Sequence, residues 1–485
     1  MADLEDFRIA VGFLRLLRGW SQEQLASACR FDPGTVSRWE RALRAPRLEN
    51  QVRLCRTVGL SWASWERLLA LIGDARREIR ASERGSAPTP ASEPEPLDDL
   101  LATLAPRVLA AYAALPAVGP PAPLAPERPQ AADRERAIEL WERLRPLAAA
   151  DRCWLVEEGE EYASWALALR LGEESRLAAP HQARESLALA ALAERVAERA
   201  AVPPLFRALL LALVAAFVGN ARRVAGDLPG ADAEFRRAER LWTEGQGGDP
   251  DGLLDGTRRL DLEASLRLQQ GRLDDALALL DRAIDESRDE GQGRLLLKKA
   301  FALEQNWFPE RALAVLEEAA QRIDPAREPR LACVLRFNQA VNLLHLKRFA
   351  EALALLPKVR ALAEDLGFAL DLLRVRWLEA RALEGLGRPE EAIERLAGVM
   401  GEFVDLEIPF DAARAGLELA ALYLDAGRTA ETRELAFEVE VILKAQGVPR
   451  DGRAAVRLFL EAAKQEIATA AQAREAFAAL RKGRE

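Results

Sequence analysis

Histidine, cysteine and methionine are scarce in this 485-residue chain, which has two histidines, four cysteines and two methionines. His181 and His345 lie in different parts of the chain, so no histidine-activated nucleophile and no HExxH zinc motif is indicated. The cysteines are far apart and form no CxxC pair, which argues against a disulfide framework or a zinc site and fits a reducing cytoplasm. Neither a GxxxxGKS/T nor a GxGxxG phosphate loop occurs. We therefore expect a protein that is not an enzyme and needs no metal or cofactor.

Long hydrophobic runs are also missing. The nearest candidate, residues 205–218, is interrupted by Arg207 and falls short of the 18 or more apolar residues of a membrane helix. The first six residues are acidic and lack the positive end and apolar run of a secretion signal. The sequence therefore predicts a cytoplasmic protein without a membrane partner.

Positive charge is concentrated at one end. The chain carries a net charge of −9, yet residues 1–80 contain 14 arginines and 10 acidic residues, a balance of +4, so the remainder carries −13. If this protein meets nucleic acid, the N-terminal end is where we expect the contact.

Helix start and stop signals divide that N-terminal region into five expected helices. Gly19 and Gly59 are typical residues at helix ends, and Ser21 with Gln24 forms a capping box. Asp32 is a good N-cap, followed by a proline that suits the first helical position. The expected helices are 7–18, 22–29, 33–41, 48–58 and 61–80. The second and third, joined by a short turn, have the helix-turn-helix arrangement.

The run LRGWSQEQLASACRFDPGTVSRWERALRAPRLENQVRLCRTVGL resembles the Cro and phage-repressor (XRE-type) helix-turn-helix family over about 65 residues. The resemblance implies a buried ion pair between Arg15 and Glu40, and a phosphate-facing glutamine at Gln22. Arg30 and Ala42 stand where the family has glycine, which puts a Cβ at two positions of positive φ and costs roughly 1 kcal/mol each.

The resemblance also places a DNA-reading surface on the third helix. Its first two residues, Pro33 and Gly34, offer nothing to a base edge, whereas Arg38 could bind a guanine. Five arginines and one acid lie in residues 41–56, as expected for phosphate contacts. The alternatives are a solvated face and a helix-turn-helix fold used only for protein contacts. The DNA-binding candidates are Gln22, Thr35, Ser37, Arg38, Arg41, Arg44 and Arg47.

Beyond this domain the composition changes twice. Residues 82–130 are rich in proline and alanine and predict a tether, with one helix at 97–115. From residue 131 onward all segments read as helical. We expect domains at 1–81 (helix-turn-helix), 82–130 (linker), 131–204 (N-terminal helices), 205–450 (repeats) and 451–485 (capping helices). In the first domain, Trp62, Trp65 and Leu69 could form an apolar homodimer face.

Six hairpin turns repeat at steps of 36 to 45 residues in the second half of the sequence. A small residue precedes each turn by seven positions, an alanine follows it by five in the first five units, and a bulky residue follows it by nine in those same units. The pattern resembles the tetratricopeptide repeat, whose hairpins stack into a solenoid with a concave groove. The turns begin at Gly226, Gly271, Trp307, Lys347, Gly387 and Gly427.

Mapping the groove-facing positions of that family onto this chain gives a set of arginines with an amide and aromatic residues nearby. Such a groove suits an acidic or carboxylate-ended peptide. We expect four of the arginines, Arg258, Arg294, Arg374 and Arg414, to form one uncompensated positive stripe. The alternatives are ordinary surface arginines and core aromatics. The groove candidates are Arg258, Arg294, Lys298, Asn338, Arg374, Trp377, Arg381 and Arg414, with Phe301, Phe337, Gln305 and His345 nearby.

The expected fold is therefore all-α, a five-helix helix-turn-helix domain tethered to an α-solenoid of tetratricopeptide-like hairpins. This domain order resembles that of the peptide-sensing transcription regulators of Gram-positive bacteria. The resemblance implies a DNA-binding transcriptional regulator whose partners are double-stranded DNA and a peptide or protein. The alternative is a non-enzymatic scaffold that uses both parts for protein–protein interaction.

Overall fold

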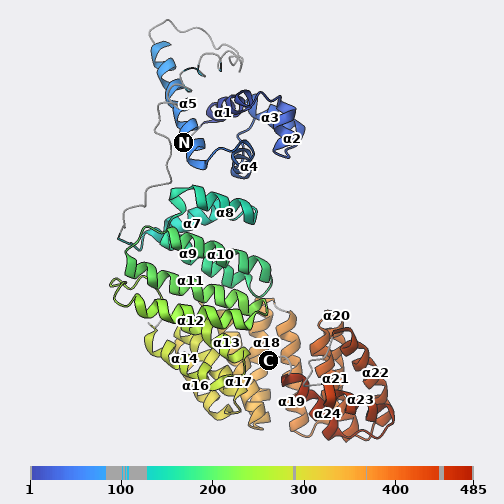
Figure 1. The fold of residues 1–485 in the computed structure, drawn as a ribbon. Coiled ribbons are helices and arrows are strands. Elements are labelled where there is room, and N and C mark those ends of the chain that lie inside the picture. Colours follow the sequence, from blue (N-terminus) through green and yellow to red (C-terminus); the bar gives the residue numbers. More distant parts are fainter. Residues whose placement is uncertain are drawn as a thin grey trace. The chain divides into compact units, whose positions relative to one another are not determined.

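A computed structural model describes residues 3–83, 101, 104, 106, 108, 128–287, 291–367, 369–446 and 453–482. Every regular element within these residues is helical, which confirms the all-α class. The chain divides into two compact units, Met1–Asp255 and Gly256–Glu485 (Figure 1). Most of the helix expected at 97–115 lies outside the described residues. Four residues of that range are described, and all four are helical: Leu101, Leu104, Pro106 and Val108.

The first unit begins with five helices, as the sequence predicts. They are α1 (Leu4–Leu17), α2 (Gln22–Ala28), α3 (Pro33–Glu40), α4 (Leu48–Val58) and α5 (Trp62–Glu83). Ser21 and Gln24 form the expected capping box on α2. The Asp32 carboxylate accepts the Gly34 N–H and so caps α3.

The two turns that flank α3 have the conformation that the sequence predicts. Arg30 and Ala42 lie at φ +54° and +52°, in the left-handed region that favours glycine. The domain therefore keeps the backbone conformation of the family at both turns, although the Cβ atoms of Arg30 and Ala42 make that conformation less favourable. Packing of Val36 and Trp39, which are 0% and 3% exposed, holds α3 in place.

The first unit continues with α7 (Asp133–Leu144), α8 (Ala149–Glu158), α9 (Trp165–Ala178), α10 (Ala183–Arg199), α11 (Pro204–Val224) and α12 (Leu228–Glu244). By length and composition α11 could cross a membrane, but 72% of its apolar window is buried inside the protein. It packs against α9, α10 and α12.

The prediction that Trp62, Trp65 and Leu69 form an exposed apolar homodimer face on α5 is wrong. Trp62, Trp65 and Leu69 are 3%, 0% and 7% exposed, so they belong to the interior of the first unit. The indole of Trp62 meets that of Trp154 edge-on, with ring centroids 6.4 Å apart. A tryptophan distant in sequence therefore covers a surface that the N-terminal sequence alone leaves open.

The second unit is a run of antiparallel helical hairpins (Figure 1). The first helices of the pairs are α13 (Thr257–Gln269), α15 (Gln292–Gln305), α17 (Pro329–His345), α19 (Ala369–Gly385) and α21 (Pro409–Asp425). Their partners are α14 (Leu273–Glu286), α16 (Pro309–Arg322), α18 (Phe349–Leu366), α20 (Pro389–Asp405) and α22 (Thr429–Gln446). Two further helices follow, α23 (Arg453–Lys464) and α24 (Ala470–Lys482), and α24 packs on α21.

The repeat rule read from the sequence has a direct structural cause. All six turn residues lie at positive φ, between +56° at Lys347 and +87° at Gly226. The five alanines seven positions earlier are at most 2% exposed, and a Cβ on Gly219 would lie 3.0 Å from the ring of Phe235. Small residues therefore stand where paired helices approach closely, and larger ones fill the spaces between hairpins.

Candidate functional site

The recognition helix α3 is held by a buried carboxylate. Arg15 on α1 donates from Nε to Glu40 Oε1 at 2.6 Å and from Nη2 to Oε2 at 3.2 Å. The Glu40 side chain is 2% exposed and that of Arg15 is 14% exposed. The expected ion pair between α1 and the end of α3 is therefore present, with the geometry of a two-pronged guanidinium–carboxylate contact.

Gln22 takes part in the same cluster. Its amide donates from Nε2 to Glu40 Oε2 at 2.6 Å, so the amide group of this expected phosphate contact is directed to α3 in the unbound protein. The Arg8 guanidinium donates to the Glu40 carbonyl at 3.0 Å. Side chains of α1 and α2 thus converge on the last residue of the recognition helix.

The exposed side of α3 carries the expected base-reading candidates. Arg38 is 54% exposed at its side chain and donates from Nη2 to Thr35 Oγ1 at 3.1 Å, beside Asp32 Oδ1 at 3.5 Å. These contacts are local and solvent-exposed, so they can be exchanged for contacts to a ligand at small cost. Ser37 is half-buried.

A cleft of about 220 Å³ lies between the recognition helix and the start of α4. Three of the expected phosphate contacts, Arg41, Arg44 and Arg47, are exposed, and their side chains make no hydrogen bond or ion pair with the part of the chain that the structure describes. By contrast, Arg53 pairs with Glu49 at 2.9 Å. The cleft is lined by Thr35, Arg38, Trp39, Arg44, Ala45, Arg47, Glu49 and Asn50.

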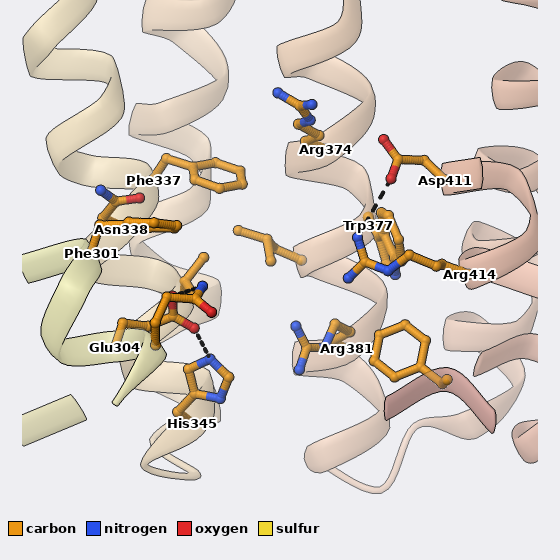
Figure 2. Close-up of a pocket in the computed structure, with 14 residues that line it drawn as sticks. Phe301, Glu304, Phe337, Asn338, His345, Arg374, Trp377, Arg381, Asp411 and Arg414 are labelled. Carbon is orange, nitrogen blue, oxygen red and sulfur yellow. Dashed lines mark hydrogen bonds and ion pairs between the residues drawn. The ribbon is translucent and has the colours of Figure 1, made fainter. Parts of the chain in front are cut away.

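The second unit contains a larger cavity, of about 540 Å³. The first helices of four successive hairpins and the C-terminal helix α24 contribute to it (Figure 2). Its walls combine aromatic rings with three arginines and two carboxylates. The lining residues are Phe301, Glu304, Gln305, Phe337, Asn338, Val341, His345, Arg374, Trp377, Leu378, Arg381, Asp411, Arg414 and Phe477.

Five of the eight groove candidates line this cavity, namely Asn338, Arg374, Trp377, Arg381 and Arg414. All four residues expected near the groove, Phe301, Gln305, Phe337 and His345, line it too. The sequence missed Glu304, Val341, Leu378 and Asp411, which repeat register places beside the others. It also missed Phe477, because nothing in the repeat pattern predicts that the C-terminal helix reaches this cavity.

The other three candidates surround one buried carboxylate away from the cavity. Lys298 Nζ donates to the Asp261 carboxylate and, at 3.0 Å, to its carbonyl, and Arg258 lies 3.5 Å from Asp261. Burial raises the pKa of Asp261, but Lys298, Arg258 and Arg294 lower it more, and the net pKa falls below its usual value. This cluster is an internal ion-pair network.

The prediction of an uncompensated positive stripe is therefore wrong. Arg374 lies 3.8 Å from Asp371, Arg414 lies 3.5 Å from Asp411, and the remaining two arginines share Asp261. Each arginine has a carboxylate three residues away or on the neighbouring helix, and such spacing places both side chains on one helix face. The stripe consists of compensated charges.

Two cavity residues are used for packing. Trp377 is 8% exposed and its indole donates to Glu418. The Arg414 guanidinium lies 5.2 Å from the centroids of both Trp377 and Phe477, and so stacks between two rings. Trp377 thus contributes one edge to the cavity while most of its surface belongs to the core.

The helix-turn-helix family model matches residues 13–65. No curated protein matches the chain. Among solved structures, the chain is similar to a Rap protein complexed with Competence and Sporulation Factor, at 14% identity and a TM-score of 0.49, with 66% of this chain and 88% of that one covered. It is also similar to aspartyl phosphate phosphatase F from Bacillus subtilis, at 12% identity and a TM-score of 0.43, with 91% and 94% covered.

A third similar structure is a signal transduction ATPase with a tetratricopeptide repeat sensor from Pyrococcus horikoshii, at 12% identity and a TM-score of 0.46, with 73% of this chain and 53% of that one covered. At these identities the likeness concerns helical-repeat architecture and extends to no activity. Residues 13–65 are therefore a helix-turn-helix domain of the Cro and phage-repressor type, joined in one chain to tetratricopeptide-like helical hairpins.

Proposed function

We propose that this protein is a cytoplasmic, DNA-binding transcriptional regulator whose repeat unit binds a peptide or protein partner. The observation that carries the DNA-binding half is the arginine-lined cleft beside α3. Arg41, Arg44 and Arg47 surround a recognition helix whose position is set by the Arg15–Glu40 pair. Cationic side chains placed next to such a helix neutralise backbone phosphates and position it in the major groove.

The cavity of the second unit supports the partner-binding half. Its volume, its aromatic walls and its few convergent polar groups are typical of a site that takes an apolar side chain and orients it. Asn338 lines the cavity and supplies an amide that can bond to a peptide backbone. A scaffold that uses both units for protein contacts would have the same cavity but no affinity for DNA.

Fluorescence anisotropy with a labelled duplex of mixed sequence tests the DNA-binding half. The variant R41Q/R44Q/R47Q should lose affinity for all duplexes alike, because phosphate contacts do not depend on sequence. The matched control is R272Q/R388Q/R428Q, which removes three exposed arginines from hairpin turns of the second unit. Equal binding by the two triple variants contradicts the assignment.

Arg38 should behave differently from the phosphate contacts. Its removal should narrow the difference in affinity between a selected preferred duplex and a random one by about 1–3 kcal/mol, the value of one good base contact. The same pair of duplexes, measured with R38A and with R44A, separates base reading from phosphate contact. If both variants narrow the difference equally, Arg38 does not read a base.

A further inference from the structure

Two arginines of the cavity differ from the other arginines near them. Arg374 and Arg381, both on α19, donate no hydrogen bond to any residue that the structure describes. Each approaches one carboxylate at longer range, Asp371 at 3.8 Å and Glu418 at 3.6 Å. A guanidinium has five N–H donors, so most of the donor capacity of both groups remains available inside the cavity.

Neighbouring arginines outside the cavity donate hydrogen bonds to carboxylates. Arg376, on the same helix, donates from both terminal nitrogens to the two oxygens of Glu402. Arg330 donates to Asp371, the same carboxylate that Arg374 reaches only at 3.8 Å. Among the described arginines of α19, the two that donate no hydrogen bond are therefore the two that line the cavity.

Helix geometry fixes the spacing of the two groups. Arg374 and Arg381 are seven residues apart, which is about two turns and a rise of about 10 Å along α19. Leu378 lies on the same wall between them. Figure 2 shows both guanidinium groups directed away from α19 toward the side of the cavity where Phe337 and Asn338 lie.

We propose that Arg374 and Arg381 anchor two carboxylates of one extended peptide, with an apolar side chain of that peptide against Leu378 and Phe337. This inference rests on the proposed function, because it presumes that the cavity takes a peptide. An extended or polyproline-type chain rises about 3.1–3.3 Å per residue, so carboxylates three residues apart span the two arginines. In the polyproline conformation, positions three apart also point to the same side.

The acidic groups around the site set the strength expected of these contacts. Glu418 faces Arg381, and Glu384 lies close enough to Arg381 for the arginine to lower its pKa, although burial and Glu418 raise that pKa overall. Asp371 faces Arg374. Each ligand carboxylate would therefore share its guanidinium with a protein carboxylate. We expect moderate affinity for this reason, with selectivity for the distance between the two carboxylates of the peptide.

Isothermal titration calorimetry with blocked tetrapeptides and the full chain tests this proposal. The probe is glutamate–leucine–proline–glutamate, and the spacing control is glutamate–glutamate–leucine–proline, which has the same composition and charge. The probe should bind about tenfold or more tightly than the control, as expected for one charge-assisted hydrogen bond. A further comparison uses glutamate–leucine–proline–alanine with either a free C-terminal carboxylate or a C-terminal amide. Tighter binding of the free acid than of the amide would show that a chain-terminal carboxylate can serve as the second anion.

Variants locate the binding. R374Q and R381Q should each weaken the probe about tenfold or more and leave the glutamine–leucine–proline–glutamine peptide unaffected. The matched control R376Q removes an arginine of the same helix that is hydrogen-bonded to Glu402, and it should leave probe binding unchanged. Circular dichroism verifies that all three variants are folded.

Four results would overturn the inference: equal binding of the two spacing isomers, equal binding of the glutamate and glutamine peptides, an equal effect of R374Q and R376Q, or no binding of any of these peptides. If the glutamate and glutamine peptides bind alike, the cavity still takes a peptide and only the two-anion assignment fails. Anisotropy with the arginine variants of the first unit reports on DNA binding independently of either result.

Discussion

Replacing Glu40 by alanine should unfold the helix-turn-helix domain while the repeats stay folded. Glu40 accepts three side-chain hydrogen bonds, two from Arg15 and one from Gln22, and its side chain is 2% exposed. Its removal leaves the guanidinium of Arg15, whose side chain is 14% exposed in the intact protein, with the Trp20 carbonyl as its one remaining acceptor among the described residues. Breaking a buried pair on one side costs about 3–5 kcal/mol, a large fraction of the stability of a small domain.

Hydrogen–deuterium exchange with mass spectrometry measures this change in the intact chain. Amides of α1–α4 should exchange roughly a hundredfold to several thousandfold faster in E40A, because each 1.4 kcal/mol is a factor of ten. Amides of α13–α22 should be unchanged. The double variant R15M/E40L, which replaces the pair by apolar side chains of similar size, should recover most of the protection.

The reasoning is refuted if E40A changes exchange in α1–α4 by less than about fivefold. It is also refuted if the losses in R15M and E40A add up in a double variant R15M/E40A. Residues that share one buried contact must couple, so the second substitution should cost far less than the first.

Two further predictions concern stability. G172A should destabilise the first unit, because the added Cβ would overlap the ring of Phe217. By contrast, a Cβ at Gly398 would have no atom within 4 Å, so G398A should stabilise helix α20 by up to about 1 kcal/mol. Thermal unfolding of both variants measures these opposite effects. The lowered pKa of Asp261 contributes stability that is present above the unfolded pKa of about 3.9 and lost as pH falls through the folded value. Urea titrations of the second unit between pH 7 and pH 3 should therefore show less acid destabilisation in D261N than in the wild type, and parallel curves would contradict the assignment.

Much of the fold follows from local signals. The capping residues Ser21 and Asp32 and the turn residues at positive φ act within a few positions of themselves, so a single sequence reveals them. The repeat rule is equally visible, since close helix crossings demand small residues at fixed offsets. The Arg15–Glu40 pair is not local, and the resemblance to a known family supplied it.

The two wrong predictions, the positive stripe and the homodimer face, concern residues whose charge or exposure is changed by another side chain. The carboxylates that compensate Arg374 and Arg414 stand three residues before them, so the i,i+3 rule applied to Asp371 and Asp411 could have shown that the stripe is neutralised. No comparable signal existed for Trp154, which covers Trp62 from a distant helix. Contacts between segments far apart in sequence depend on the tertiary arrangement, which no local pattern encodes.

The dependence of DNA affinity on salt tests the central claim most directly. Anisotropy of a labelled random duplex, titrated with the full chain between about 50 and 200 mM salt, gives the slope of log K against log salt concentration. Arg41, Arg44 and Arg47 are expected to provide about three phosphate contacts, so the slope should be about −2.7, at about −0.9 per contact. Absence of binding at low salt, or binding with a slope near zero, would contradict a DNA-binding regulator and favour a scaffold.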